Sequence, residues 1–257
     1  MCGKEWSYEA SSIYALYTSW EKSGASREKR GKMADQHILR AQMTYYRQMA
    51  QEYDATTGQT EELQRAFAQA RDLLQQLGQL GPCEQMLELA CGTGTWTRAL
   101  LPLGRALTAI DASPEMLALA RQKVGNASVQ FQQADLFQWQ PSQQYDLVFF
   151  ANWLSHVPPQ RLDAFLSTVA RAVRPGGSLA IMDQYAPMQE DREISVETEE
   201  GAIYANRTLR SGQTFLIVKV FYPLHVIEHL LDALGFAVTV HQLDDIFFFL
   251  EARRTGA

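Results

Sequence analysis

The chain has 257 residues, of which 46% are hydrophobic and 20% are charged, and its formal net charge at pH 7 is −6. This composition is typical of a globular protein, and the length suits one α/β domain with an added segment. Because the net charge is negative and the basic residues are scattered, nucleic acid is not expected as a partner.

Cysteine usage and hydropathy narrow the class of protein further. Cys2, Cys83 and Cys91 form no CxxC pair and no pattern with nearby histidines, so neither a disulfide framework nor a metal site is expected. No apolar run is long enough to span a membrane, and the first residues do not resemble a signal peptide. These features predict a cytoplasmic protein without a membrane partner.

Residues 1–58 are predicted to form a helical extension or lid. A first apolar stripe at helical spacing is expected to fold over the site or onto a second subunit of a homodimer; it comprises Ile13, Leu16, Tyr17 and Trp20. Residues 23–32 are expected to be an exposed connection. A second helix follows, with a stripe made by Leu39, Met43, Tyr46, Ala50 and Tyr53.

From residue 59 onward, predicted helices alternate with predicted strands, which indicates a parallel sheet. Thr60 can cap the first of these helices, and Ser113 followed by Pro114 is a strong helix start. The expected strands are Met86–Ala90, Leu107–Asp111, Val129–Asp135, Tyr145–Asn152 and Ser178–Asp183. We therefore predict a core domain over residues 59–257.

The last part of the chain has a different pattern. Two strands joined at Ser211–Gly212 are expected within an insertion near residues 194–222, which would help to build an acceptor pocket. A helix is expected over Pro223–Leu234, and two final strands are expected to form a hairpin at the sheet edge.

The segment LELACGTGTW, Leu87–Trp96, carries the main chemical signal. Gly92 and Gly94 allow a sharp turn between a strand and a helix, with close backbone approach to a ligand. Glu88 lies on the strand, and Asp111 ends the next strand, where a carboxylate can accept the hydroxyls of a ribose. A dinucleotide site is disfavoured, because Thr97 occupies the position of the third glycine of GxGxxG.

Later strand ends add polar groups to the same crevice. Asp135 follows the third strand and can accept a hydrogen bond from an adenine amine, while Leu136 can pack on the ring. Asn152 and Trp153 follow the fourth strand, at the mouth of the crevice.

The order of these segments resembles that of class I, Rossmann-like S-adenosylmethionine (SAM)-dependent methyltransferases of the small-molecule type. The resemblance covers about residues 81–183 and is carried by ELACGTG, DASPEMLALAR, QADLF, YDLVFFANWLSHVP and RAVRPGGSLAIMD. It implies a doubly wound α/β fold with a mostly parallel seven-stranded sheet whose last strand is antiparallel. It also implies a SAM pocket lined by Glu88, Ala90, Gly92, Gly94, Asp111, Ala112, Met116, Asp135, Leu136 and Asn152.

One departure from the family pattern is visible, because Ala90 replaces the first motif glycine. Its methyl group is small, but it would keep the backbone slightly farther from a bound ligand. The segment Tyr45–Asp54 resembles a lid of small-molecule members. By that likeness Tyr46 and Tyr53 would cover the cofactor, and Arg47 could pair with its carboxylate; plain helix packing is the alternative.

The implied reaction is an in-line transfer of a methyl group, with S-adenosylhomocysteine as the product. His156 is the candidate general base, since its ordinary pKa near 6.5 suits proton removal at neutral pH. A helix cap or a half-buried histidine is the alternative interpretation. Trp153 and Tyr222 are candidates for the acceptor side, and His225 is a weaker one.

The predicted function is methyl transfer to an oxygen or nitrogen of a small-molecule acceptor. Transfer of another group, such as an aminopropyl group, would need an acidic cluster for a polyamine. A non-catalytic SAM-binding protein is a further alternative, which the intact glycine loop and Asp111 disfavour. A nicotinamide dehydrogenase is disfavoured by Thr97.

Overall fold

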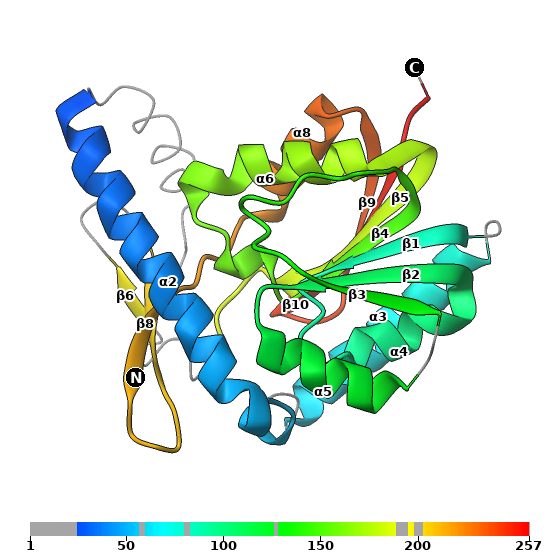
Figure 1. Ribbon diagram of the computed structural model, residues 1–257. Coiled ribbons are helices and arrows are strands. Elements are labelled where there is room, and N and C mark those ends of the chain that lie inside the picture. Colours follow the sequence, from blue (N-terminus) through cyan, green and yellow to red (C-terminus); the bar gives the residue numbers. More distant parts are fainter. Residues whose placement is uncertain are drawn as a thin grey trace, which may run out of the picture.

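The structure is a computed structural model that describes residues 25–56, 60–79, 83–125, 128–188, 195–197 and 203–256. A seven-stranded sheet in the order β3-β2-β1-β4-β5-β10-β9 forms its centre, and a separate three-stranded sheet has the order β6-β7-β8 (Figure 1). The strands of the large sheet are β1 (Cys83–Leu89), β2 (Gly104–Asp111), β3 (Val129–Gln133), β4 (Tyr145–Ala151), β5 (Val173–Gln184), β9 (Phe236–Gln242) and β10 (Phe247–Arg254).

Strand direction in the large sheet agrees with the doubly wound prediction. β1 pairs in parallel with β2 and β4, β2 with β3, and β4 with β5. β10 pairs antiparallel with both β5 and β9. The prediction of a mostly parallel sheet with an antiparallel last strand is therefore confirmed, and β9, rather than β10, lies at the edge.

Helices cover both faces of the large sheet (Figure 1). They are α3 (Glu61–Gly78), α4 (Thr95–Leu100), α5 (Pro114–Val124), α6 (Pro159–Ala172) and α8 (Leu224–Ala233). Because successive strand residues point to opposite faces, Phe149 packs with the α3 side and Phe150 with the α6 side. Both rings are fully buried, as the continuous apolar run of β4 predicts for a strand covered on both faces.

The predicted helix caps form as hydrogen bonds. The Thr60 hydroxyl accepts from the Leu63 amide at 3.3 Å, and the Ser113 hydroxyl accepts from the Met116 amide at 3.1 Å. These side chains satisfy amides that have no partner inside α3 and α5, so both helices begin where the sequence indicates.

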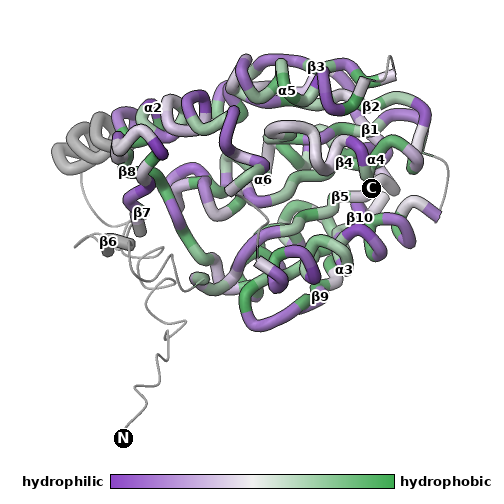
Figure 2. The backbone as a smooth tube through the Cα atoms, turned by 90° about the horizontal axis from the view of Figure 1, so that it is seen from below, coloured by the Kyte–Doolittle hydropathy of each residue, from purple (hydrophilic) through white to green (hydrophobic). Residues whose placement is uncertain are grey.

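The long helix α2 (Ala25–Thr56) and the small sheet lie beside one another at one end of the molecule (Figures 1 and 2). The small sheet consists of β6 (Ser195–Glu197), β7 (Ile203–Thr208) and β8 (Thr214–Val218). Tyr45 of α2 packs against it in a cluster with Ala205, Leu209, Phe215 and Ile217. The predicted strand pair joined at Ser211–Gly212 is confirmed as β7 and β8.

Two sequence-based boundaries were wrong. Residues 25–32 belong to α2 instead of an exposed connection, because most of them are good helix formers and the single Gly31 does not end a long helix. The RPGG segment, expected to separate a helix from a strand at Ser178, lies inside β5, where Val173 already pairs with Tyr145 before a register shift. The predicted stripe from Ile13 to Trp20 lies outside the described residues.

No helix in the described part of the chain is both long enough and apolar enough to cross a membrane.

Candidate active site

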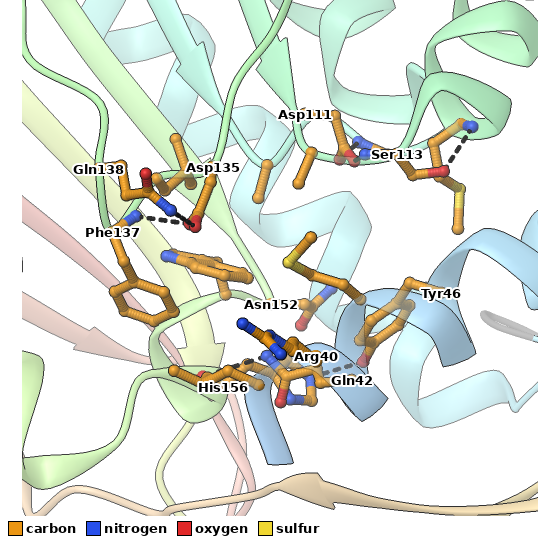
Figure 3. Close-up of a pocket in the computed structure, with 18 of the residues that line it drawn as sticks. Arg40, Gln42, Tyr46, Asp111, Ser113, Asp135, Phe137, Gln138, Asn152 and His156 are labelled. Carbon is orange, nitrogen blue, oxygen red and sulfur yellow. Dashed lines mark hydrogen bonds between the residues drawn. The ribbon is translucent and has the colours of Figure 1, made fainter. Parts of the chain in front are cut away.

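A cavity of about 500 Å³ lies between the carboxyl ends of the parallel strands and helix α2. This is the crevice where ligands bind in doubly wound sheets. Most of the residues expected at the site line it: Tyr46, Tyr53, Ala90, Gly92, Asp111, Ala112, Met116, Asp135, Leu136, Asn152, Trp153 and His156. Figure 3 shows how ten of the lining residues lie.

The glycine loop turns with three residues in the left-handed region. Ala90, Gly92 and Gly94 have φ angles of 53°, 53° and 85°. At Gly92, no heavy atom lies within 4 Å of the position that a Cβ would take, so the backbone there is open to a ligand. At Gly94, a Cβ would lie 3.2 Å from the Cα of Ala120, so this glycine permits close packing of the loop on α5.

Asp111 ends β2 and holds the glycine loop. Its two carboxylate oxygens accept hydrogen bonds from the amides of Gly92 and Ser113, both at 2.8 Å. Burial raises the pKa of Asp111, while these amide bonds oppose the shift. A carboxylate held by two amides at the cavity wall still has lone pairs for ligand hydroxyls.

Asp135 lies after β3 at the other end of the wall (Figure 3). Its Oδ1 accepts from the Phe137 amide at 2.9 Å, and its Oδ2 accepts from the Gln138 side chain at 2.8 Å. Phe137 packs against Trp153 with ring centroids 5.6 Å apart. This end of the cavity therefore combines an acid with aromatic surface, which suits a flat polar ring such as a purine.

The side of the cavity formed by α2 carries a hydrogen-bonded tyrosine and histidine. His156 Nδ1 lies 2.8 Å from the Val218 carbonyl oxygen, which can only accept, so Nδ1 bears the proton. Nε2 therefore accepts from the Tyr46 hydroxyl, 2.9 Å away. Burial, with a smaller effect of the Lys219 charge, lowers the pKa of His156 to about 3, and burial raises the pKa of Tyr46 well above 10. Both groups are neutral at pH 7.

Polar contacts fasten α2 over the cavity. Gln42 is buried and joins the helix to β8 through its Oε1 and the Val218 amide, 3.0 Å apart. Arg47 donates from two nitrogens to Glu115 of α5, at 2.9 to 3.2 Å. Asp54 pairs with Lys123 at 2.6 Å and accepts from Thr93 of the glycine loop at 2.6 Å.

Residues 86–177 match the family of methyltransferase domains. A DhpI complex with S-adenosylhomocysteine superimposes with a TM-score of 0.70 and 38% sequence identity, covering 86% of this chain and 98% of that chain. A DhpI complex with SAM and HEP superimposes with a TM-score of 0.73 and 38% sequence identity, covering 84% of this chain and 97% of that chain. The chain belongs to the class I SAM-dependent methyltransferases. Its cofactor is SAM.

Curated relatives match the methyltransferase core. An uncharacterized methyltransferase of Staphylococcus carnosus is 30% identical over 55% of this chain and 67% of its own length. A trans-aconitate 2-methyltransferase of an Azoarcus species is 36% identical over 44% of this chain and 43% of its own length. The match thus spans 43% to 67% of the length of these two relatives.

Four residues expected at the methyltransferase site do not line the cavity. Arg47 is engaged by Glu115, and Gly94 faces α5. Glu88 is buried, and its Oε2 accepts from the Thr97 hydroxyl at 2.5 Å. Tyr222 is buried, and its hydroxyl donates to the Val157 carbonyl at 2.7 Å. Their predicted contacts with SAM or an acceptor remain predictions.

Several lining residues were missed by the sequence analysis. Most come from α2 or from the turn after β3, and they include Gln36, Arg40, Gln42, Met43, Phe137, Gln138 and Arg161. Polar residues on a helix normally face solvent, so Arg40 and Gln42 gave no signal of their own. Gln42 lies one turn before Tyr46, and this spacing was the available clue. His225, the weaker candidate, is exposed at the start of α8.

Proposed function

We propose that this methyltransferase transfers the methyl group of SAM to an oxygen of a small-molecule acceptor. The observation that carries the proposal is one shared cavity. Asp111 and Asp135 line it on the sheet side, and the neutral pair of Tyr46 and His156 lines it on the α2 side. A cavity of about 500 Å³ suits a cofactor and a small acceptor and leaves no room for a folded macromolecule. The relative named trans-aconitate 2-methyltransferase supports a small acceptor.

The sheet side provides the groups that would hold SAM. Asp111 would accept from the ribose hydroxyls, and Asp135 from the adenine amine, with Leu136 and Met116 against the ring. The open backbone at Gly92 would lie along the methionine part. Tyr53, whose pKa is raised by burial to about 12, stays neutral and offers its ring to a positively charged sulfur. When bound, SAM supplies a methyl group on a sulfonium, which is already a good leaving group.

The α2 side would position the acceptor. Met43, Tyr46 and Trp153 line the same cavity as Asn152. The main contribution of this chain would then be alignment of an acceptor oxygen with the methyl group in the cavity. His156 would fix the orientation of Tyr46, because its Nε2 holds the tyrosine hydroxyl.

Deuterium-labelled SAM tests the proposal. The protein is incubated with trideuteromethyl SAM and a panel of small acids, alcohols, phenols and amines, and the products are examined by mass spectrometry. We expect labelled methyl on an oxygen of at least one acceptor, together with S-adenosylhomocysteine. Label found only on nitrogen, carbon or sulfur would contradict the oxygen assignment, and no label on any acceptor would contradict methyl transfer to small molecules.

A further inference from the structure

The hydrogen bonds at the α2 side of the cavity run in one fixed direction. They begin at the Val218 carbonyl oxygen, which has no proton and can only accept. His156 therefore donates from Nδ1, at 2.8 Å, and a neutral ring then has an acceptor at Nε2. The Tyr46 hydroxyl, 2.9 Å from Nε2, must donate to it (Figure 3). The one proton of this hydroxyl is thus used inside the protein.

The histidine ring stays neutral near pH 7, which keeps this direction unchanged. Burial, with a smaller effect of the Lys219 charge, lowers the pKa of His156 to about 3. A protonated ring would donate from both nitrogens, and the Tyr46 hydroxyl would then accept from it and keep its own proton for a ligand. Because that charged form is rare near pH 7, the direction of the bond follows from the tautomer of the neutral ring.

The Tyr46 oxygen keeps lone pairs that no described group uses. A hydroxyl oxygen has two lone pairs besides its proton, and Tyr46 makes no second hydrogen bond among the described residues. Tyr46 and His156 both line the cavity, and the bond between them is only partly buried. Toward a ligand, the Tyr46 hydroxyl therefore offers a hydrogen-bond acceptor and no donor.

Packing fixes the position of this oxygen. The Tyr46 ring lies edge-on to the rings of Tyr45 and His156, with centroids 5.0 and 5.5 Å away. Gln42, one turn earlier on α2, is buried; it accepts from the Val218 amide at 3.0 Å and donates to the His156 carbonyl oxygen at 3.3 Å. Since both partners of the bond are held in this way, the Tyr46 oxygen is in place before a ligand binds.

We propose that the methyl acceptor carries a hydroxyl or N–H group beside its reacting oxygen, and that this group donates a hydrogen bond to the Tyr46 oxygen. This inference rests on the proposed function. Tyr46 is then a specificity-determining residue, because an acceptor without the donor group would leave the tyrosine oxygen unpaired in the closed complex. The bond orients the acceptor and takes no proton from it, since the Tyr46 hydroxyl is already protonated.

The tautomer of His156 tests the direction of the bonds without any acceptor. Protein labelled with ¹⁵N-histidine is examined at pH 7 by long-range proton–nitrogen NMR, and the His156 signals are assigned by comparison with His156→Asn. We expect a protonated Nδ1 and an unprotonated Nε2. A ring protonated at Nε2, alone or together with Nδ1, would overturn the proposal, because Tyr46 would then direct its own proton toward the ligand.

Matched pairs of acceptors test recognition by Tyr46. The acceptor that gives most product in the labelling screen is compared with its analogue in which the donor group is replaced by hydrogen; glycolate with acetate and catechol with phenol are such pairs. We expect the wild type to favour the donor-bearing compound about tenfold in kcat/KM, and Tyr46→Phe to favour it no more than about twofold. The ratio in the variant accounts for the intrinsic reactivity of the two compounds.

Tyr185→Phe is the matched control, because the Tyr185 hydroxyl donates to the Asp244 carbonyl oxygen at 2.8 Å and Tyr185 is not among the residues that line the cavity. It should keep the preference of the wild type. Equal losses with both compounds of a pair in Tyr46→Phe would overturn the proposal, since they would mark a purely structural role. Weaker binding of S-adenosylhomocysteine to Tyr46→Phe would also overturn it, because the Tyr46 oxygen would then serve the cofactor.

The chemistry of the best acceptor separates this inference from the proposed function. A best acceptor that is methylated on oxygen but has no neighbouring hydroxyl or N–H group would refute the inference and leave the proposed function intact. Absence of labelled product with every acceptor would refute the proposed function and, with it, the acceptor group assigned to Tyr46.

Discussion

Ala90 directly follows β1 and has a backbone conformation that favours glycine. Its φ of 53° places it in the left-handed region, which costs a residue with a Cβ about 1 kcal/mol or more. The sequence indicated a departure from the family at this position, but it could not show that the chain keeps the glycine conformation with an alanine. The departure therefore affects strain in the loop as well as the approach of a ligand.

We predict that Ala90→Gly stabilises the protein by up to about 1 kcal/mol, because relief of the strained φ exceeds the added flexibility of the unfolded chain. Gly94→Ala should instead destabilise it by about 1–3 kcal/mol, since φ is 85° and the new Cβ would press on Ala120. Urea unfolding measures both. A destabilised Ala90→Gly variant would show that the loop tolerates the alanine without strain.

At the scale of elements, the ion pair between Arg47 and Glu115 fastens α2 to α5. Both side chains are about half exposed, at 52% and 40%, so solvent screens the pair and its contribution is small. Arg47→Gln and Glu115→Gln should therefore speed the release of S-adenosylhomocysteine by equal factors, up to about fivefold. The double variant should release it no faster than either single variant, because both changes remove the same ion pair. Stopped-flow displacement measures these rates.

This comparison also decides the role predicted for Arg47 from sequence. If Arg47 bound the carboxylate of SAM, its substitution would slow binding or speed release far more than that of Glu115. Arg105→Met is the control, because Arg105 pairs with Glu84 at the far end of β1 and β2. Its release rate should equal that of the wild type.

The elements of the core could be predicted because each carries a local signal. Apolar strand runs, Thr60 and Ser113 as caps, and the glycine loop all depend on neighbouring residues. The extent of α2 was missed because Gly31 and a charged run imitate a connection. The strand pair β7–β8 was predicted, but its place in a separate sheet with β6 was not, since a hairpin pattern does not reveal which sheet it joins.

In the candidate site too, residues with a local signal could be predicted, and residues placed by tertiary packing could not. Residues at strand ends, such as Asp111 and Asn152, could be placed because parallel strands bring their carboxyl ends together. Arg40 and Gln42 could not, because their position depends on how α2 packs beside the carboxyl ends of the strands. The pairing of Tyr46 with His156 joins residues 110 positions apart, which no local pattern indicates.

At the scale of the whole molecule, buried ionisable groups make stability depend on pH. Burial raises the pKa of Glu88 to about 8, so between about pH 4.5 and 8 the unfolded chain is ionised there while the folded chain is not. Stability then falls as the pH rises through this window. As the pH rises from 5 to 8, the free energy of unfolding of Glu88→Gln should therefore increase by about 1 kcal/mol or more relative to that of the wild type. Urea unfolding measures this difference.

His156 makes stability depend on pH in the opposite direction and serves as the comparison. Burial lowers its pKa to about 3, so stability falls as the pH drops below about 6.5, where the unfolded histidine is protonated and the folded one is not. As the pH falls from 8 to 5, the free energy of unfolding of His156→Asn should rise relative to that of the wild type. Parallel pH profiles for all three proteins would contradict the assigned burial of both groups.

The central claim is that SAM binds in the cavity between the strand ends and α2, held by the carboxylate of Asp111. Calorimetric titration with S-adenosylhomocysteine tests it most directly, using the wild type, Asp111→Asn and the exposed control Asp72→Asn. We predict saturable binding to the wild type and the control, and an affinity at least about tenfold weaker for Asp111→Asn. Equal affinity in all three proteins would contradict the account.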